Sequence, residues 1–197
     1  MSCDIVLVGV GGQGVLTIAD LLIRAAFEAD VPATYCPTKG MAQRGGFVKG
    51  EVRLGQDGVG SRIGEGQADL VVAMERSEAL KGLPFLKPDG TFLLFDHVWA
   101  PTGVMLGADT YPERDQVLEE IAAFSQELIV LDPKKLPTVD GQKARPNIYI
   151  LGAMIGRSIV GEILSIEVVE SAISARWPRV AETNLAAFRF GIPGNGA

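Results

Sequence analysis

Three glycines near the amino terminus have the spacing of a phosphate-binding loop. Gly9, Gly11 and Gly14 match the pattern G-x-G-x-x-G, after a short apolar segment and before a segment with helical apolar spacing. Glycine permits the tight turn and the close backbone approach to a ligand that such a loop needs. The N–H groups at the start of the following helix would then bind an anion. The same glycines could instead serve only to let that helix pack closely on a sheet, and both interpretations stay open.

A dinucleotide is one candidate ligand for this loop. Dinucleotide-binding folds place an Asp or Glu about 20 residues further on, at the end of the second strand, where it binds a ribose. Residues 35–38 (Tyr-Cys-Pro-Thr) contain no acid, and Glu28 and Asp30 precede the expected strand. A stand-alone dinucleotide-binding oxidoreductase is therefore the weaker alternative.

A second glycine-rich segment, residues 38–46, reads Thr-Lys-Gly-Met-Ala-Gln-Arg-Gly-Gly. Its basic and amide side chains supply donors for a phosphate or carboxylate, and its glycines supply backbone freedom. Arg44 is the best single candidate for pairing with such an anion. An ordinary polar connection is the alternative, but it accounts poorly for this density of glycine and arginine. The candidate binding residues of the two segments are Gly11, Gly12, Gln13, Gly14, Lys39, Gly40, Gln43, Arg44, Gly45 and Gly46.

Cysteine and histidine are scarce, which limits the chemistry that the chain can perform by itself. The two cysteines, Cys3 and Cys36, can form neither a disulfide framework nor a four-cysteine iron–sulfur site. His97, the single histidine, and Asp96 follow an expected strand, where ligands often gather in α/β sheets. We nevertheless expect both to be solvated loop residues, and we assign no catalytic residue and no metal ligand.

Strands and helices alternate along the chain and would hold the two glycine segments. Apolar runs predict strands, while the 3.6-residue spacing predicts helices. The strand at 47–54 alternates in polarity, so we expect it to be antiparallel or near an edge, and residues 88–90 (Pro-Asp-Gly) predict a turn. The predicted fold is a single domain, residues 1–197: a Rossmann-like three-layer α/β fold with a mostly parallel sheet and a helical carboxyl-terminal portion. Strands are predicted at 4–9, 31–35, 47–54, 69–74, 91–95 and 128–131, and helices at 15–29, from about 77, and at 111–126, 147–164, 166–177 and 180–189.

The overall charge argues against nucleic acid and anionic membranes as partners. Eighteen basic and 24 acidic residues give a net charge of −6, where such partners favour a basic surface. One basic cluster, formed by Lys39, Arg44, Lys49 and Arg53, could bind a phosphate or a partner's carboxylates, or it could be a solvated strand face. The apolar runs are too short to cross a membrane, and no signal peptide is evident. We expect a cytoplasmic protein.

The two glycine segments together resemble the γ-type subunit of the 2-oxoacid:ferredoxin oxidoreductases. The first reads Gly-Val-Gly-Gly-Gln-Gly at 9–14, and the second reads Gly-Met-Ala-Gln-Arg-Gly-Gly at 40–46. The second form looks most like the β subunit of the indolepyruvate members. Residues 145–147 (Arg-Pro-Asn) and 151–153 (Leu-Gly-Ala) are similar to the carboxyl-terminal region of the family, and the chain length matches as well.

The resemblance implies a subunit that is inactive alone. Its larger partner would hold thiamine pyrophosphate, Mg²⁺ and iron–sulfur clusters, with coenzyme A as co-substrate and ferredoxin as electron acceptor. The sequence agrees with this division, because it contains no Gly-Asp-Gly motif for a diphosphate and only two cysteines. The substrate implied is a 2-oxoacid, with an aryl pyruvate such as indolepyruvate favoured. The candidate binding residues would then face the thiamine subunit or a coenzyme A path. A non-catalytic scaffold subunit is the remaining alternative.

Overall fold

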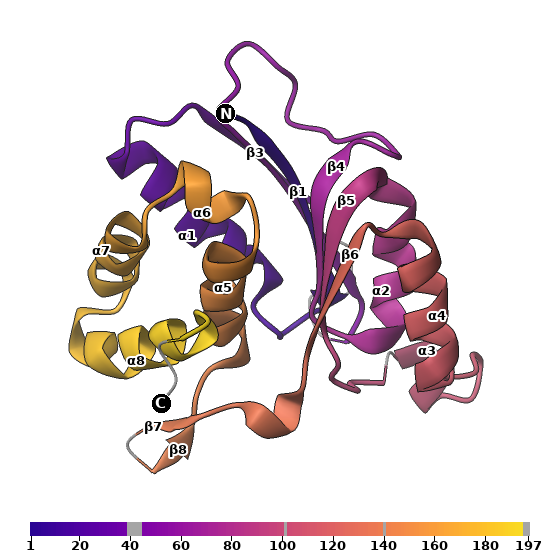
Figure 1. The fold of residues 1–197 in the computed structure, drawn as a ribbon. Helices are drawn as coiled ribbons and strands as arrows, with labels where there is room; N and C mark the ends of the chain where they lie inside the picture. Colours follow the sequence, from indigo (N-terminus) through magenta and orange to yellow (C-terminus); the bar gives the residue numbers. More distant parts are fainter. Residues whose placement is uncertain (39–44, 101, 140, 195–197) are drawn as a thin grey trace.

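A six-stranded sheet forms the centre of the molecule (Figure 1). The computed structural model describes residues 1–38, 45–100, 102–139 and 141–194. The strand order is β2-β3-β1-β4-β5-β6, with β4, β5 and β6 parallel to β1 and with β3 antiparallel to both of its neighbours. The strands are β1 (Cys3–Val10), β2 (Ala33–Thr38), β3 (Phe47–Leu54), β4 (Ala68–Ala73), β5 (Leu86–Phe95) and β6 (Glu127–Leu131).

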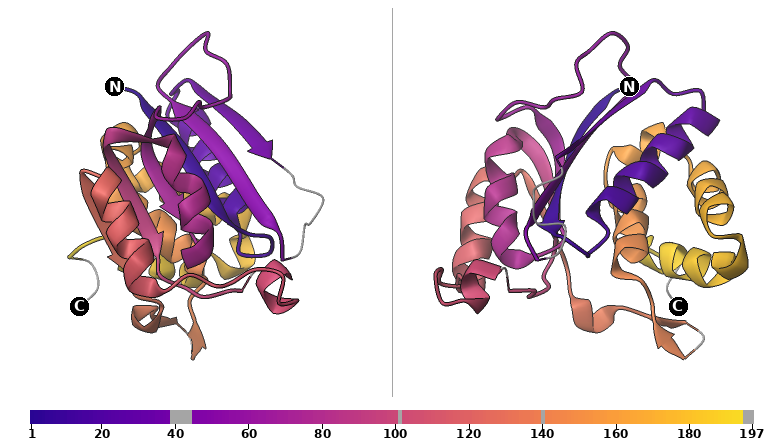
Figure 2. Two further views of the ribbon diagram at one scale, coloured as in Figure 1. Left: turned by 90° about the vertical axis from the view of Figure 1, so that its right-hand side faces the viewer. Right: turned by 180° about the vertical axis from the view of Figure 1, so that it is seen from behind.

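Helices cover both faces of this sheet, so the predicted three-layer α/β fold with a helical carboxyl-terminal portion is confirmed (Figures 1 and 2). One face carries α1 (Val15–Glu28), α5 (Pro146–Arg157), α6 (Val160–Ile163), α7 (Ile166–Arg176) and α8 (Ala181–Gly191). The other face carries α2 (Arg76–Gly82) and α4 (Arg114–Phe124). Shorter elements complete the chain: α3 (Thr102–Met105), a hairpin of β7 (Thr138–Val139) and β8 (Gln142–Lys143), and 3₁₀ turns at Leu83–Phe85, Pro133–Lys135 and Pro178–Val180.

The central strand β1 is buried along its whole length. Its side chains alternate between two cores: Ile5 and Leu7 pack with the α1 and α5–α8 layer, while Val6 and Val8 pack with the α2 and α4 layer. A strand covered on both faces needs apolar residues at every position, which explains its continuous apolar run.

The antiparallel strand β3 lies between β1 and β2, as its alternating sequence predicted. Because β3 pairs with β1 from Leu54 opposite Cys3 to Phe47 opposite Val10, the start of β3 stands beside the end of β1. On the other side of β1 lies β4, and the helices that follow β1 and β4 cover opposite faces of the sheet. Such a divergence opens a crevice at the carboxyl ends of the two strands, where ligands of open α/β sheets commonly bind.

Two local predictions were wrong. The turn predicted at Pro88–Gly90 is instead an irregular stretch within β5. These residues have no β4 partner, because the register shifts from Leu86 opposite Ala68 to Thr91 opposite Leu70. The single helix predicted at 147–164 is two helices, α5 and α6. The chain is extended at Ser158, whose hydroxyl donates to the Met154 carbonyl at the end of α5.

The carboxyl-terminal helices pack closely through small residues. A methyl group added at Gly152 of α5 would collide with the Phe188 carbonyl oxygen of α8, and one added at Gly191 would collide with the Tyr149 carbonyl oxygen. The glycines therefore let the two backbones touch. This contact fixes α5, whose first turn stands beside the glycine loop of β1.

Candidate functional site

The two glycine segments meet at the carboxyl end of β1, at the lower edge of the sheet in Figure 1. The Gly11 N–H donates to the Gly46 carbonyl at 2.8 Å, and the Gly45 N–H donates to the Gly11 carbonyl at 3.3 Å. The antiparallel register of β3 produces this juxtaposition. Of the candidate binding residues, Lys39, Gly40, Gln43 and Arg44 lie outside the described part of the chain.

Gly12 and Gly14 have positive φ angles of 107° and 89°, a region that glycine enters without strain. Gly14 is the N-cap of α1, and a Cβ atom there would lie 2.5 Å from the Asn147 amide nitrogen of α5. Both the turn and the helix contact therefore require glycine. This explains the motif without any ligand, so the loop pattern alone does not establish an anion site.

Gln13 braces the glycine loop from within. Its side-chain oxygen accepts the Val10 N–H at 2.8 Å, and its amide nitrogen donates to the Met74 carbonyl at 2.9 Å. The side chain thus joins the ends of β1 and β4. Sequence reasoning placed Gln13 at a cofactor or partner contact, but its two hydrogen bonds to the main chain give it a structural role as well.

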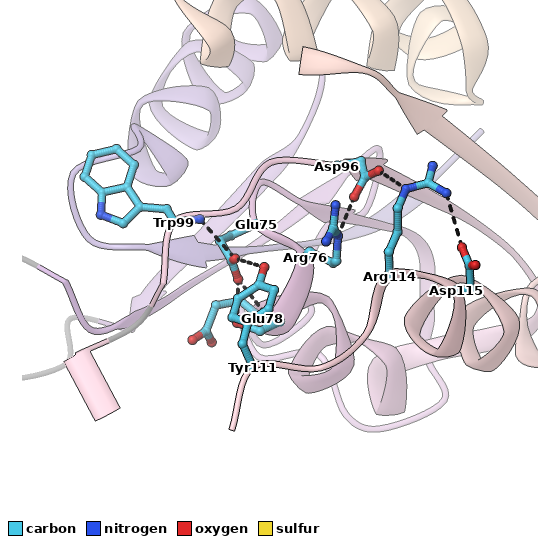
Figure 3. Close-up of polar contacts among 9 residues, drawn as sticks. Glu75, Arg76, Glu78, Asp96, Trp99, Tyr111, Arg114 and Asp115 are labelled. Atoms are coloured by element: carbon cyan, nitrogen blue, oxygen red, sulfur yellow. Dashed lines mark hydrogen bonds and ion pairs between the residues drawn. The ribbon is translucent and has the colours of Figure 1, made fainter. Parts of the chain in front are cut away.

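A buried glutamate, Glu75, anchors the segment that follows β5 (Figure 3). One carboxyl oxygen accepts the Trp99 N–H at 3.2 Å and the Tyr111 hydroxyl, and the other accepts the Glu78 N–H at 2.9 Å and the Ser77 hydroxyl at 2.6 Å. Burial, together with the hydrogen bond to Glu75, raises the pKa of Tyr111, which keeps its hydroxyl a donor. Glu75 therefore caps α2 and also anchors the segment after β5 at Trp99 and Tyr111. Sequence analysis missed it.

The anchored segment contacts the described end of the second glycine segment. Both the N–H and the hydroxyl of Thr102 donate to the Gly45 carbonyl, at 3.3 and 3.1 Å. The ends of β1, β3 and β5 are in this way connected through main-chain and side-chain hydrogen bonds. They form one continuous edge.

Aromatic side chains line a cleft at this edge. Its volume is about 140 Å³, and its walls are Gly12, Gln13, Met74, Phe95, His97, Trp99 and Pro146. The rings of Phe95 and His97 stack with centroids 5.8 Å apart, and Trp99 is tilted against His97 at 6.3 Å. The expectation of a solvated His97 was therefore wrong, since its ring is held between two others.

Asp96 was also expected to be solvated, and it is not. Its carboxylate accepts from the Nε atoms of Arg76 and Arg114, each at 2.6 Å, and only 8% of the side chain is exposed (Figure 3). These groups border a second hollow of about 490 Å³, which Asp132 and Lys134 also line. The sequence analysis singled out Asp96 and His97 for their position after a strand.

The basic cluster proposed from the sequence is not an open patch in its described part. Lys49 pairs with Glu51 at 3.2 Å and stacks on the Phe85 ring, while Arg53 pairs with Asp4 at 3.5 Å and donates to a main-chain carbonyl. These side chains are mostly buried, so neither a solvated strand face nor a free anion site describes them.

The strand order bears on the dinucleotide hypothesis. In the dinucleotide-binding order 3-2-1-4-5-6, the strand that carries the ribose-binding acid is the direct neighbour of the first strand. Here β3 separates β2 from β1, and the end of β2 contains no acid.

Across the described ranges no group of three or more His, Cys, Asp or Glu could hold a metal ion. In the same part of the chain, no helix has the length and apolar character that a membrane crossing requires.

Comparisons with known proteins agree with the family inferred from the glycine segments. Residues 4–193 match the family described as pyruvate ferredoxin/flavodoxin oxidoreductase. The indolepyruvate oxidoreductase subunit IorB of Archaeoglobus fulgidus is 34% identical over 192 residues, covering 97% of this chain and 94% of that protein. The subunit of the same name from Thermococcus kodakarensis is 33% identical, covering 96% and 94%.

Solved structures share the fold. Pyruvate oxidoreductase subunit PORC of Thermotoga maritima superposes with a TM-score of 0.69 at 22% identity, over 96% of this chain and 94% of that one. The γ subunit of a keto/oxoacid ferredoxin oxidoreductase from Geobacter sulfurreducens gives 0.66 at 24%, over 98% of both chains. A 2-oxoglutarate:ferredoxin oxidoreductase from Magnetococcus marinus gives 0.67 at 17%, over 96% of this chain and 30% of that one. By its match over almost its full length, the chain belongs to the pyruvate ferredoxin/flavodoxin oxidoreductase family.

Proposed function

We propose that this chain is the small subunit of a thiamine-pyrophosphate-dependent 2-oxoacid:ferredoxin oxidoreductase and is inactive alone. The observation that carries the proposal is the end-to-end match to subunits of indolepyruvate oxidoreductases. The Magnetococcus marinus enzyme adds support, because there the same fold makes up 30% of one longer chain. A fold that is part of a larger polypeptide in one enzyme is well suited to be a separate subunit in another.

The larger partner subunit would hold thiamine pyrophosphate, Mg²⁺ and the iron–sulfur clusters. With two cysteines, of which Cys3 is buried, this chain has too few thiolates for a cluster of its own. The thiamine cofactor would supply the decarboxylation chemistry, and the clusters would carry electrons to ferredoxin. What the present chain contributes is a shaped, rigid edge.

That edge is where we place the partner contact. The segment after β5 exposes large apolar side chains beside the glycine loops: Trp99 is 45% exposed, and Met105 and Leu106 are 74% and 78% exposed. Exposed apolar groups gathered in one region often mark a protein interface. The glycine segments, including Arg44, would face the thiamine subunit or the path by which coenzyme A reaches it.

An aryl pyruvate is the substrate that we propose, with coenzyme A as co-substrate. The names of the relatives support this choice, since four of them are subunits of indolepyruvate oxidoreductases. We further propose a cytoplasmic location, where a reducing environment keeps cysteines such as Cys3 and Cys36 free. Cell fractionation tests that location.

The subunit assignment is tested by anaerobic affinity purification of the chain from its own cells, followed by mass spectrometry and a visible spectrum. We expect a co-purifying larger subunit with cysteine-rich cluster motifs, brown absorbance and bound thiamine pyrophosphate. A colourless chain that purifies alone would overturn the assignment. Turnover of the purified complex is then measured with aryl, branched-chain and simple 2-oxoacids, using ferredoxin reduction as the signal.

A second comparison separates a working subunit from a scaffold. We expect Arg44→Ala to lower turnover or coenzyme A affinity by at least tenfold while the complex still assembles, because an arginine paired with an anion is not easily replaced. The matched control is Arg24→Ala: Arg24 is exposed on α1 and pairs with Asp20 of its own helix. Unchanged turnover in both variants would favour a non-catalytic scaffold.

A further inference from the structure

The cleft at the edge of the sheet has walls suited to one kind of group. Phe95, His97 and Trp99 present rings to it, and Met74 and Pro146 add further apolar surface. The remaining side chain, Gln13, is already bound to the main chain at both ends of its amide. Apart from the His97 imidazole, these walls offer mainly apolar contacts, which suit a flat apolar group, whereas a strongly polar ligand would find few partners.

The size of the cleft suits a small aromatic ring system. Its volume of about 140 Å³ is close to the roughly 150 Å³ of an engineered apolar cavity that binds benzene. Gly12 keeps the space open: a Cβ atom there would point toward Trp99 and lie 4.0 Å from its outer ring carbon. Since Trp99 remains 45% exposed, part of its indole surface is free to contact a ligand.

The main chain that carries the His97 and Trp99 rings is anchored before any ligand arrives. The Trp99 main-chain N–H donates to the buried Glu75 carboxylate at 3.2 Å, and the His97 main-chain carbonyl accepts the Arg76 main-chain N–H at 3.0 Å. His97 has a buried Nδ1 atom with no hydrogen-bond partner among the described residues, so stacking on Phe95 is the contact that orients the ring. A preformed wall binds more tightly, because little side-chain freedom is lost on binding.

We propose that this cleft binds a planar aromatic ring of a ligand and that Trp99 is its stacking residue. Only the choice of ligand rests on the proposed function. Two compounds of that function carry a flat ring joined to an anionic group: an aryl 2-oxoacid and coenzyme A with its adenine. The flat ring that these two compounds share is the group that the cleft would recognise.

Tryptophan fluorescence of the full chain tests the ring contact directly. The chain has two tryptophans, Trp99 and Trp177, so Trp177→Phe leaves Trp99 as the single reporter. The probes are phenylpyruvate and adenosine 3′,5′-bisphosphate, with pyruvate and ribose 5-phosphate as matched compounds that lack the aromatic ring. We expect saturable quenching by one aromatic probe, which identifies the source of the ring, and none by the ring-free compounds. Equal quenching by ring-free compounds, or none by any probe, would refute the proposal.

Calorimetric titration of the same probes into cleft variants supplies a second test. Loss of one stacking partner weakens base binding by roughly tenfold or more, so Trp99→Ala should lower affinity by about that factor, and Trp99→Phe should restore most of it. Val98→Ala is the control, because Val98 is adjacent and 50% exposed but does not line the cleft. Equal affinity of Trp99→Ala and Val98→Ala would overturn the stacking role.

The outcome is independent of the subunit assignment. If the complex with a thiamine subunit assembles and turns over while the cleft binds no ring, the cleft proposal fails and the proposed function stands. If the chain purifies alone yet Trp99 is quenched by a ring-bearing probe, the subunit assignment fails and the cleft remains a binding site. The two experiments therefore fail separately.

Discussion

Replacing Glu75 with glutamine should destabilise the chain, although it removes a buried charge and keeps the shape of the side chain. Glu75 is fully buried, and all four groups that contact its carboxyl oxygens are donors. A carboxylate accepts on both oxygens, whereas an amide has one oxygen and one NH₂ group. Each Glu75 oxygen accepts one main-chain N–H, from Trp99 on one side and from Glu78 on the other. Whichever way the amide turns, its NH₂ group faces an N–H group that it cannot accept.

The loss of stability in Glu75→Gln can be estimated from the hydrogen bonds that the amide cannot make. One buried main-chain N–H loses its acceptor, which costs about 1–3 kcal/mol, and the remaining bonds lose the assistance of the charge, which adds about 1 kcal/mol. The two hydroxyls, on Ser77 and Tyr111, can rotate and accept from the amide, so they add little. We therefore expect Glu75→Gln to lower the free energy of unfolding by about 2–4 kcal/mol.

Urea unfolding of the full chain, followed by circular dichroism, measures this loss. Glu78→Gln is the matched control, because Glu78 is equally buried and close in sequence, but among the described residues its carboxyl group pairs only with Lys81, whose side chain is 55% exposed. Burial disfavours the charged form of Glu78, and its ion pair with a largely exposed lysine contributes only about 0–1 kcal/mol, so the control should lose no stability. Amide hydrogen exchange should also become faster at Trp99 or at Glu78 in Glu75→Gln. A Glu75→Gln variant as stable as the wild type, or more stable, would refute the claim that both Glu75 oxygens must accept hydrogen bonds.

Further predictions concern neighbouring features. Burial raises the pKa of Glu78 above its usual value near 4.5, against the opposing effect of Lys81. The wild type therefore loses stability as the pH rises through the folded-state pKa, because Glu78 must ionise while buried. Glu78→Gln should be more stable than the wild type in urea unfolding between pH 4.5 and 7, with no gain below pH 4.5. Gly152→Ala should lower the free energy of unfolding by about 1–3 kcal/mol, because its methyl group collides with the α8 main chain, while Gly60→Ala, in open space, should change the midpoint of thermal unfolding little. Gln13→Leu should cost about 1–3 kcal/mol in urea unfolding, since it leaves the Val10 N–H without its acceptor; an unchanged midpoint would argue against the brace.

Local sequence patterns were enough to predict most of the fold. The β1 run, the glycine loop and α1 follow one another in the chain, so their order and type depend on neighbouring residues alone. The antiparallel character of β3 was predictable for the same reason, because the alternating polarity that indicates it lies within the eight residues of the strand itself. Turn propensity failed at Pro88–Gly90, because it does not reveal that pairing with β4 occurs on both sides of these residues, at Leu86 and at Thr91.

The candidate site was harder to predict, because its contacts join distant residues. Gln13 was identified from its motif, but its hydrogen bond to the Met74 carbonyl spans 61 positions. Glu75 attracted no attention in the sequence, since nothing near it indicates that Trp99 and Tyr111, 24 and 36 positions away, donate to its carboxylate. His97 was noticed only for its place after a strand, and its aromatic neighbours at every second position gave the one signal that could have predicted the stack.

Because the two glycine segments are hydrogen-bonded to each other, the geometry of these loops depends on the register in which β3 pairs with β1. Gly11 reaches the Gly46 carbonyl because Phe47 stands opposite Val10, and that alignment depends on the buried side chains of β3, such as Val52. A slip of one residue would turn those side chains toward the wrong face and would carry the carbonyl away from its donor. Core substitutions in the far half of β3 should therefore behave in genetic screens like lesions of the loops themselves.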